Sequence, residues 1–293
     1  MEKNKKVAYQ SVETINYKRV AVLALATLVG AVVIIGVFIL LYKASASTTT
    51  SSADPATTAR VVANLAAIPP TDLNQIGIGS AQNIIKPISG GQSLTGSNGK
   101  PEILYVGAEY CPYCAVERWA VVIALDRFGS FSGLGLTTSS ASDVYPSTNT
   151  LTFSNSSYTS KFVDFTPVEQ FGNKPQPTGG YNQLQFLSTK QQQLLAVYDE
   201  APYTSSPGSI PFVDLANQYV FSGATVSPGV ISGMNWDDVV TNLKNPTSDV
   251  AKGILGSANL ITAAVCQITK QQPTLVCNTP LIKQVEQSLP AGK

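Results

Sequence analysis

The segment Cys111-Pro112-Tyr113-Cys114 constrains the fold of this chain more than any other part of the sequence. It follows an apolar run over 103–106, typical of a buried strand, and it leads into residues 115–122, typical of a helix. At a strand-to-helix junction this spacing sets the two sulfurs one helical turn apart. The free backbone N–H groups at the start of the helix, together with the positive end of the helix dipole, favour a thiolate at the first cysteine. Pro112 suits the first helical turn, where its missing N–H costs nothing. The segment predicts thiol/disulfide chemistry.

The same cysteine pair is compatible with half of a zinc site or with a static disulfide. A zinc site needs four ligands, yet the chain has no histidine and only two other cysteines. Cys266 and Cys277 are eleven positions apart and do not form a second tight pair. A four-cysteine zinc site is therefore a minor alternative, and we expect neither a metal nor an organic cofactor.

A second informative segment, residues 208–224, reads as two apolar strands joined by a short turn at Asn217-Gln218. Pro211 stands at the entrance of the first strand, where a proline removes no internal ladder hydrogen bond. The segment predicts a β-hairpin that is entered through a proline.

Together the two segments resemble the thioredoxin fold. Residues 108–114 are similar to the active-site turn of that superfamily, with Tyr110 where Trp is common and with the Pro-Tyr insert of glutaredoxins. Ile210-Pro211 falls where the superfamily has its cis-proline, and Gly223-Ala224 where the next strand commonly carries glycine. The resemblance implies an α/β thioredoxin-like fold with a cis bond before Pro211. The residues implied for the substrate groove are Tyr110, Pro112, Tyr113, Ile210 and Pro211.

Two features depart from that resemblance. Small thioredoxins carry a buried acid several residues before the first cysteine, whereas Tyr105 holds that place here and Glu102 and Glu109 are the only carboxylates nearby. No proton acceptor is therefore transferred. About 96 residues separate Cys114 from Pro211, so we expect a large insertion between the active-site helix and the hairpin, as in the larger periplasmic oxidoreductases and isomerases.

Residues 20–42 predict a transmembrane helix. The run is uncharged over about 22 residues, enough to cross a hydrocarbon core of roughly 30 Å. Five positive residues precede the run, whereas only Lys43 follows it closely. The positive-inside rule therefore leaves residues 1–19 in the cytoplasm and the rest outside, with lipid contact through 20–42. The five residues are Lys3, Lys5, Lys6, Lys18 and Arg19.

A cleaved signal peptide is the alternative, because Ala44-Ser45-Ala46 has the small-x-small form of a cleavage site. The apolar run is longer than the roughly 7 to 15 residues of a signal h-region, which favours the single-pass anchor. Either arrangement places all four cysteines outside the cytoplasm, where disulfides persist.

Residues 43–69 are expected to be a tether, since 44–58 are mostly Ser, Thr and Ala and cannot bury enough apolar surface to fold. Residues 70–293 are expected to form one extracytoplasmic domain. Asn155-Ser156-Ser157 is an N-glycosylation sequon, for which chance and occupancy both remain open.

Within that domain the patterns predict short elements around the cysteine turn and the hairpin. Thr150 to Phe165 reads as a hairpin within the insertion, and Gln170 to Gly180 as a loop. Helices are predicted from Pro112 to about Phe128, from Ser188, after an N-cap at Asn235, and from Ser248 to Thr269, with a further strand near 134–139.

Cys266 and Cys277 flank a polar stretch in which Pro273 can turn the chain back. Outside the cytoplasm a structural disulfide that closes this loop is the simpler interpretation, worth roughly 2 to 4 kcal/mol on the chain-entropy model. A second redox pair that exchanges electrons with Cys111 and Cys114 remains the alternative.

The composition indicates a protein that faces acid. Charged residues make up 13% of the chain, the net charge is +1 and histidine is absent, so few groups change their proton binding at low pH. With its cysteine turn and its carboxy-terminal cysteine pair, the chain resembles an uncharacterised, mostly crenarchaeal family of membrane-anchored thioredoxin-like proteins, a domain of unknown function. Nucleic-acid binding is not expected at this net charge.

Two functions follow as hypotheses. The first is a membrane-tethered extracytoplasmic thiol/disulfide oxidoreductase that acts on cysteines of secreted or surface proteins, with Cys111 as nucleophile, Cys114 as resolving thiol and a membrane redox partner. In acid Cys111 needs a strongly lowered pKa, to which Arg118 or Lys100 could contribute. The second is a non-catalytic envelope binding module in which both cysteine pairs are permanent disulfides.

Overall fold

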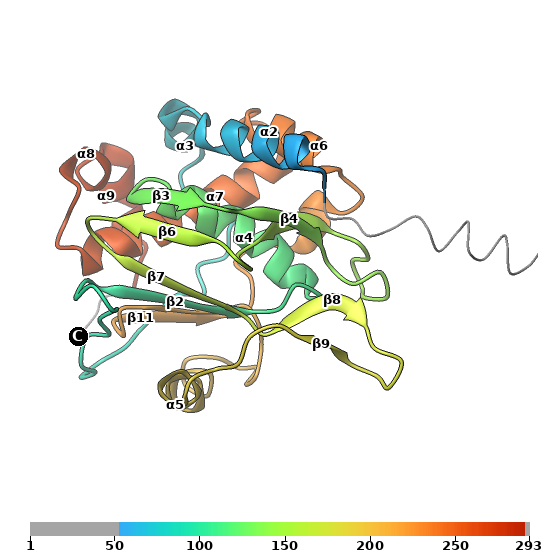
Figure 1. Ribbon diagram of the computed structural model, residues 1–293. Helices are drawn as coiled ribbons and strands as arrows, with labels where there is room; N and C mark the ends of the chain where they lie inside the picture. The colour runs from blue at the N-terminus through green and yellow to red at the C-terminus, as the bar shows by residue number, and fades with distance from the viewer. Residues whose placement is uncertain (1–52, 291–293) are drawn as a thin grey trace, which may run out of the picture. The chain divides into compact units, whose positions relative to one another are not determined.

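The computed structural model describes residues 53–290, which are organised around a central five-stranded mixed sheet (Figure 1). Its strand order is β1-β11-β10-β2-β7. Strands β2 and β7 are parallel, and the other neighbours are antiparallel. The strands are β1 (Lys86–Pro87), β2 (Glu102–Gly107), β7 (Asp164–Glu169), β10 (Phe212–Leu215) and β11 (Tyr219–Ser222).

The sheet is buried on both faces at its centre, which is why β2 reads as a continuous apolar run rather than an alternating one. Ile103 and Tyr105 point into the larger of two cores, whereas Leu104 and Val106 point into the smaller. The strand predicted at 103–106 is confirmed, with one more residue at each end.

Helices cover the two faces unequally (Figure 1). The larger core packs against α4 and α7, which contact each other, while the smaller core is covered by partly buried side chains of α5 and the segments beside it. Every residue of α4 except Tyr113 is buried, as expected of a helix enclosed on all sides. The helices are α2 (Pro55–Ala66), α3 (Pro70–Ile76), α4 (Pro112–Leu125), α5 (Thr189–Tyr198), α6 (Trp236–Leu243), α7 (Asp249–Ile268), α8 (Thr274–Cys277) and α9 (Pro280–Glu286), with the 3-10 helix η1 (Pro228–Ile231).

The folded part begins well before residue 70, so the tether predicted over 43–69 is wrong for its described portion. Asp54 caps α2 by accepting hydrogen bonds from the N–H groups of Ala56 and Thr57. Val61 and Leu65, one turn apart, are buried in the larger core. The predicted cytoplasmic segment 1–19, the transmembrane helix 20–42 and the rest of the tether lie outside the described residues.

The chain between Cys114 and Pro211, for which the sequence predicts a large insertion, forms two segments, which we call the intervening segments. The first is a long bent hairpin that leaves α4 and returns to β7, and its turn spans residues 139–148. Its paired strands are β3 (Gly129–Ser132) with β6 (Ser157–Ser160), and β4 (Gly135–Thr138) with β5 (Asn149–Thr152). The hairpin predicted at 150–165 is therefore wrong. The Ser-rich stretch between β5 and β6 is a bend within the returning arm of the long hairpin, because β5 pairs with β4 and β6 pairs with β3.

The second intervening segment lies between β7 and β10 and consists of a small hairpin followed by α5. The loop predicted from Gln170 to Gly180 is wrong in its first half: β8 (Phe171–Pro175) lies within it and pairs with β9 (Tyr181–Gln183) just beyond it. The glycines Gly179 and Gly180 have φ of 90° and 73° and form its turn, a conformation that glycine adopts without strain. The helix starts predicted at Ser188, Asn235 and Ser248 are confirmed, since each side chain caps its helix.

The carboxy-terminal helices are joined by a disulfide between Cys266 and Cys277, as predicted. Both cysteines are fully buried, and the bond links the end of α7 to α8. Helix α7 is also the one helix of residues 53–290 that is long and apolar enough to cross a membrane. Since α7 is buried in the larger core for most of its length, packing accounts for its composition.

Candidate functional site

Cys111 lies at the amino-terminal end of α4, at the carboxyl end of β2. It is the N-cap residue, with φ of −79° and ψ of 122°, and Pro112 follows at the first helical position. Its Sγ accepts a hydrogen bond from the N–H of Cys114 at 3.3 Å, so the sulfur takes the place of the oxygen of a usual cap. Cys111 is 6% exposed, and both cysteines of the turn are free thiols.

The two cysteines differ strongly in acidity. The pKa of the Cys111 thiol is lowered by the hydrogen bond with the Cys114 thiol, then by the N–H of Cys114 and by the charge of Arg118. Burial, together with the hydrogen bond to Cys111, holds the pKa of the Cys114 thiol well above its usual range. Cys111 is therefore the sulfur that ionises, and Cys114 stays protonated.

The hairpin entrance lies directly against Cys111. The Ile210–Pro211 peptide bond is cis, as predicted, and the Cys111 thiol donates to the carbonyl oxygen of Ile210 at 3.7 Å. Residues nearly a hundred positions apart thus meet because β10, which follows Pro211, pairs with β2, which precedes Cys111. Of the groove residues predicted from the sequence, Tyr113 is 43% exposed, whereas Pro112 is buried.

A buried ion pair lies beneath the cysteine turn. Arg118, one turn beyond Cys114, donates from Nε and Nη2 to the two carboxylate oxygens of Glu169 on β7, each at 2.7 Å. Its Nη2 also donates to the carbonyl oxygen of Ala108 at 2.7 Å. Both side chains are fully buried. The ion pair therefore connects α4, the cysteine turn and the end of β7.

Glu169 is a site residue that sequence reasoning missed. The sequence does not reveal residues 164–169 as a parallel strand, because Thr166 and Pro167 separate the apolar Phe165 and Val168. A carboxylate at the end of a strand, facing an arginine on the predicted helix, is the signal that could have revealed it. Of the two cations proposed to act on Cys111, Arg118 has this role. Lys100 instead donates to the carbonyl oxygen of Ser160 at 2.6 Å.

Tyr105 is buried on β2, at the position where small thioredoxins carry a buried acid. Its hydroxyl and the Nη1 of Arg118 are buried and have no hydrogen-bond partner among the described residues. Burial holds the pKa of Tyr105 well above its usual range, so the phenol stays protonated. The two nearby carboxylates are engaged elsewhere, because Glu109 accepts from the Thr152 hydroxyl and Glu102 from that of Thr166.

A family model described as a domain of unknown function, DUF929, matches residues 91–267, a range that holds the cysteine turn, Glu169 and the Ile210–Pro211 bond. The chain belongs to this family. No curated protein and no solved structure matches it.

The DUF929 match covers the central sheet apart from β1, both intervening segments and nearly all of α7. It ends one residue after Cys266, so Cys277 lies outside it. Within the described part of the chain, no group of three His, Cys, Asp or Glu side chains is placed to hold a metal ion. Since Cys266 and Cys277 bond to each other, they supply no thiolates to a four-cysteine zinc site.

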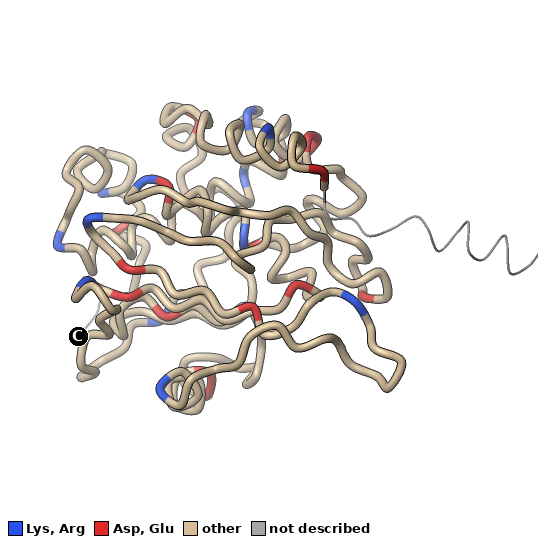
Figure 2. Tube along the Cα trace, viewed as in Figure 1, with Lys and Arg blue, Asp and Glu red and all other residues tan. Residues whose placement is uncertain are grey.

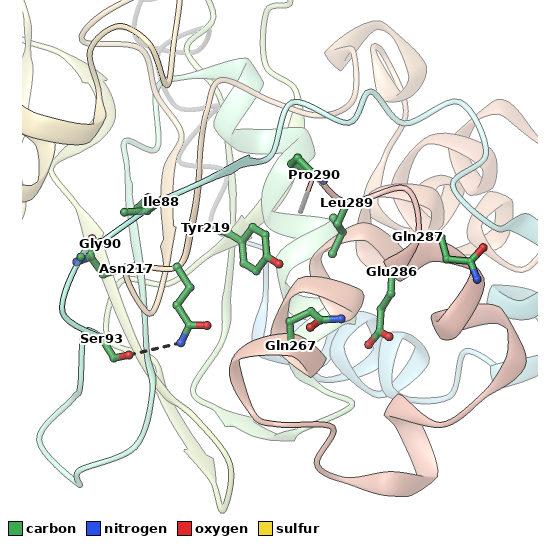
Figure 3. Close-up of a pocket in the computed structure, with 12 residues that line it drawn as sticks. Ile88, Gly90, Ser93, Asn217, Tyr219, Gln267, Glu286, Gln287, Leu289 and Pro290 are labelled. Carbon is green, nitrogen blue, oxygen red and sulfur yellow. Dashed lines mark hydrogen bonds between the residues drawn. The ribbon is translucent and has the colours of Figure 1, made fainter. Parts of the chain in front are cut away.

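A surface pocket of about 820 Å³ lies away from the cysteine turn of this DUF929 protein (Figure 3). It is formed where the β10–β11 turn meets the carboxy-terminal helices, and its lining is mainly polar. The amide of Gln218 donates to the Ser93 hydroxyl at 3.5 Å within it. None of the residues predicted for the site lines this pocket.

Proposed function

We propose that this DUF929 protein is an extracytoplasmic thiol/disulfide oxidoreductase with a thioredoxin-like fold, anchored through residues 20–42 and acting on cysteines of secreted or surface proteins. The observation that carries the proposal is Cys111 itself. Its sulfur caps a helix, its pKa is lowered, and it lies 3.7 Å from the Ile210 carbonyl oxygen beside a cis-proline. A static structural disulfide needs none of these features.

The surroundings of the cysteine turn support the fold part of the proposal. The resemblance implies that backbone next to the cis-proline lies against the active-site sulfurs. Here Ile210 contacts Cys111, and the hairpin that follows Pro211 pairs with the strand that leads into the cysteine turn. The α/β arrangement with helices on both faces of the sheet is compatible with such a fold.

The extracytoplasmic location is supported by two independent features. The positive residues lie before the apolar run 20–42, which orients the rest of the chain outward. The Cys266–Cys277 disulfide belongs to an oxidising compartment, because the cytosol of most cells would keep such thiols reduced.

The proposed cycle begins with a disulfide between Cys111 and Cys114. A client thiolate attacks Sγ of Cys111, an S–S bond forms between client and enzyme, and Cys114 leaves and takes up a proton. A second client thiolate then attacks the client sulfur of this mixed disulfide, which closes the client disulfide and releases the Cys111 thiolate. The client loses two electrons and the enzyme gains them, and a membrane redox partner with an oxidising disulfide or quinone removes them.

The acidity difference between the two thiols favours this direction. A lowered pKa at Cys111 stabilises its thiolate as the leaving group of the mixed disulfide and stabilises the reduced enzyme. A raised pKa at Cys114 keeps that sulfur protonated once it has been released. An enzyme with these properties donates disulfides.

Oxidative refolding of a reduced secreted protein tests the proposal. The full chain, with its Cys111–Cys114 pair oxidised, should transfer one disulfide to the client per enzyme, and Cys111→Ser should abolish the transfer. The variant Leu275→Ala, 90% exposed and remote in sequence from the turn, serves as the control and should behave as the wild type. An oxidised pair that does not exchange with the client would contradict the enzymatic function and leave a binding module.

A further inference from the structure

The two intervening segments are anchored on the cysteine turn. The ring of Tyr181, from the β8–β9 hairpin, stacks on that of Tyr110 with centroids 4.3 Å apart and planes inclined by 10°. The Tyr181 hydroxyl donates to Oγ of Ser140 at 2.8 Å, and the N–H of Ser140 donates to the carbonyl oxygen of Tyr110 at 2.8 Å. Tyr110, the β8–β9 hairpin and the β4–β5 turn thus hold one another in place.

A second tyrosine pair lies on the other side of Cys111 in sequence. Tyr113 meets the ring of Tyr145 edge-to-face, with centroids 6.3 Å apart and planes at 87°. Tyr145 belongs to the β4–β5 turn, as does Val144, which is 73% exposed. Figure 1 shows this turn and the β8–β9 hairpin at the same end of the molecule as the start of α4.

These four tyrosines, the tyrosine rim, suit the binding of an extended chain. Tyr110, Tyr145 and Tyr181 are partly exposed, and Tyr113 is more exposed still. Tyrosine offers a large apolar face and a hydroxyl with few rotatable bonds, so little conformational entropy is lost on contact. Since Cys111 is only 6% exposed, a client sulfur that reaches it must bring its neighbouring residues close to these rings.

Charge of both signs lies near the rim. Asp143 adjoins Val144 in the β4–β5 turn and acts electrostatically on Tyr110, and Glu109 directly precedes that tyrosine. Lys174, exposed on β8, adjoins Pro175, which pairs with Tyr181. Over the described residues the charged side chains are likewise few and of mixed sign (Figure 2). The rim therefore distinguishes client segments by ring contacts rather than by charge.

We propose that the tyrosine rim selects extended client segments in which an aromatic or large apolar residue adjoins the reacting cysteine. This substrate preference rests on the proposed thiol/disulfide exchange at Cys111. The client is an unfolded secreted or surface polypeptide, because only an extended chain brings both a sulfur and its neighbours to a nearly buried thiol.

Three short peptides test the preference, each a mixed disulfide with 5-thio-2-nitrobenzoate and differing only in Phe, Ser or Asp before the cysteine. The full chain carries Cys114→Ser. The Cys111 thiolate attacks the peptide sulfur, the Cys111–peptide disulfide forms and the coloured thiolate leaves, so absorbance gives the rate. The Phe peptide should react about 3- to 10-fold faster than the Ser and Asp peptides, in line with the strength of aromatic pairs.

Tyr145→Ala and Tyr181→Ala should remove most of the preference for Phe. The preference is the ratio of the Phe rate to the Ser rate within each variant, and the rate with 2-hydroxyethyl disulfide, which is small and uncharged, reports any general change at Cys111. Leu275→Ala should retain the full ratio. Tyr181→Phe, which keeps the ring but loses the bond to Ser140, should retain most of it.

Equal rates for the three peptides in the parent chain would overturn the proposal. So would an equal slowing of peptides and 2-hydroxyethyl disulfide in the tyrosine variants, because the rings would then only hold the cysteine turn. If the parent chain reacts with neither peptides nor 2-hydroxyethyl disulfide, the exchange activity itself fails, an outcome distinct from loss of selectivity.

Discussion

At the scale of single residues, the chemistry of the cysteine turn depends on a buried charge. Arg118 lowers the pKa of Cys111 through space, after the direct hydrogen bonds from Cys114, and Glu169 fixes the arginine with two hydrogen bonds. Burial of the pair is tolerated because its bonds are short and bidentate. Nη1 of Arg118 is left without a partner in residues 53–290, on a side chain whose charge also acts on Cys114.

Removing Arg118 should raise the pKa of Cys111 and destabilise the fold. Arg118→Met leaves Glu169 as a buried, unpaired carboxylate, and breaking such a pair costs about 3 to 5 kcal/mol of unfolding free energy. The double variant Arg118→Met/Glu169→Gln should recover much of this stability while the raised pKa of Cys111 remains. The pH dependence of Cys111 alkylation, beside denaturant unfolding, separates the two effects. An unchanged alkylation profile in the double variant would show that the arginine does not act on the thiol.

At the scale of elements, α2 is part of the folded unit, although its composition suggested a tether. Leu65 and Val61 pack into the core that encloses α4 and α7. Asp54 and Pro55 start the helix, a combination of N-cap and first-position proline that the Ser/Thr-rich surroundings concealed.

Leu65→Ala should therefore destabilise the protein by about 2 to 5 kcal/mol, because it leaves a cavity in a buried contact. The matched control is Ala59→Ser on the exposed side of the same helix, which should change the unfolding free energy by less than about 0.5 kcal/mol. Denaturant unfolding of both variants gives the comparison. A Leu65→Ala variant as stable as the control would contradict the packing of α2 into the core and favour the tether.

Elements with strong local signals could be predicted from the sequence. The cysteine-turn helix, the proline-entered hairpin and the helices that begin at Ser188, Asn235 and Ser248 all carry caps or periodicity that act locally. The pairing of β5 with β4, and the place of β7 in the sheet, depend on contacts between distant segments and could not. The same holds for the site: Cys111 and Pro211 were predicted from motifs, whereas Glu169 and Tyr181 reach it through tertiary pairing.

At the scale of the whole molecule, the buried acids favour low pH. Burial raises the pKa of Glu117, on α4, to about 7, although it accepts hydrogen bonds from Thr225 and Ser257. Burial likewise raises the pKa of Asp214, on β10, to about 7, with Glu102 adding to the rise and Lys190 opposing it. Both acids bind a proton more tightly in the folded state than in the unfolded state.

Stability should therefore fall as the pH rises from about 4 to about 7. In that window the folded state holds more protons than the unfolded state, so the unfolding free energy decreases with pH. Glu117 alone accounts for roughly 3 kcal/mol of this loss. Glu117→Gln should flatten the profile and raise stability at neutral pH. Denaturant unfolding at several pH values checks this, and a wild-type profile that rises through the same window would be incompatible with it.

The reduction potential of the Cys111–Cys114 pair tests the central claim most directly. The full chain is equilibrated in redox buffers of known poise and quenched with acid. Alkylation of the peptide that carries Cys111 and Cys114 then gives the reduced fraction of this pair, while the Cys266–Cys277 disulfide stays intact. A lowered Cys111 pKa predicts an oxidising pair, with a potential above the roughly −270 mV of thioredoxin and toward the roughly −120 mV of a strong periplasmic oxidant. A pair that stays oxidised below about −300 mV would contradict the account, because such a disulfide is structural.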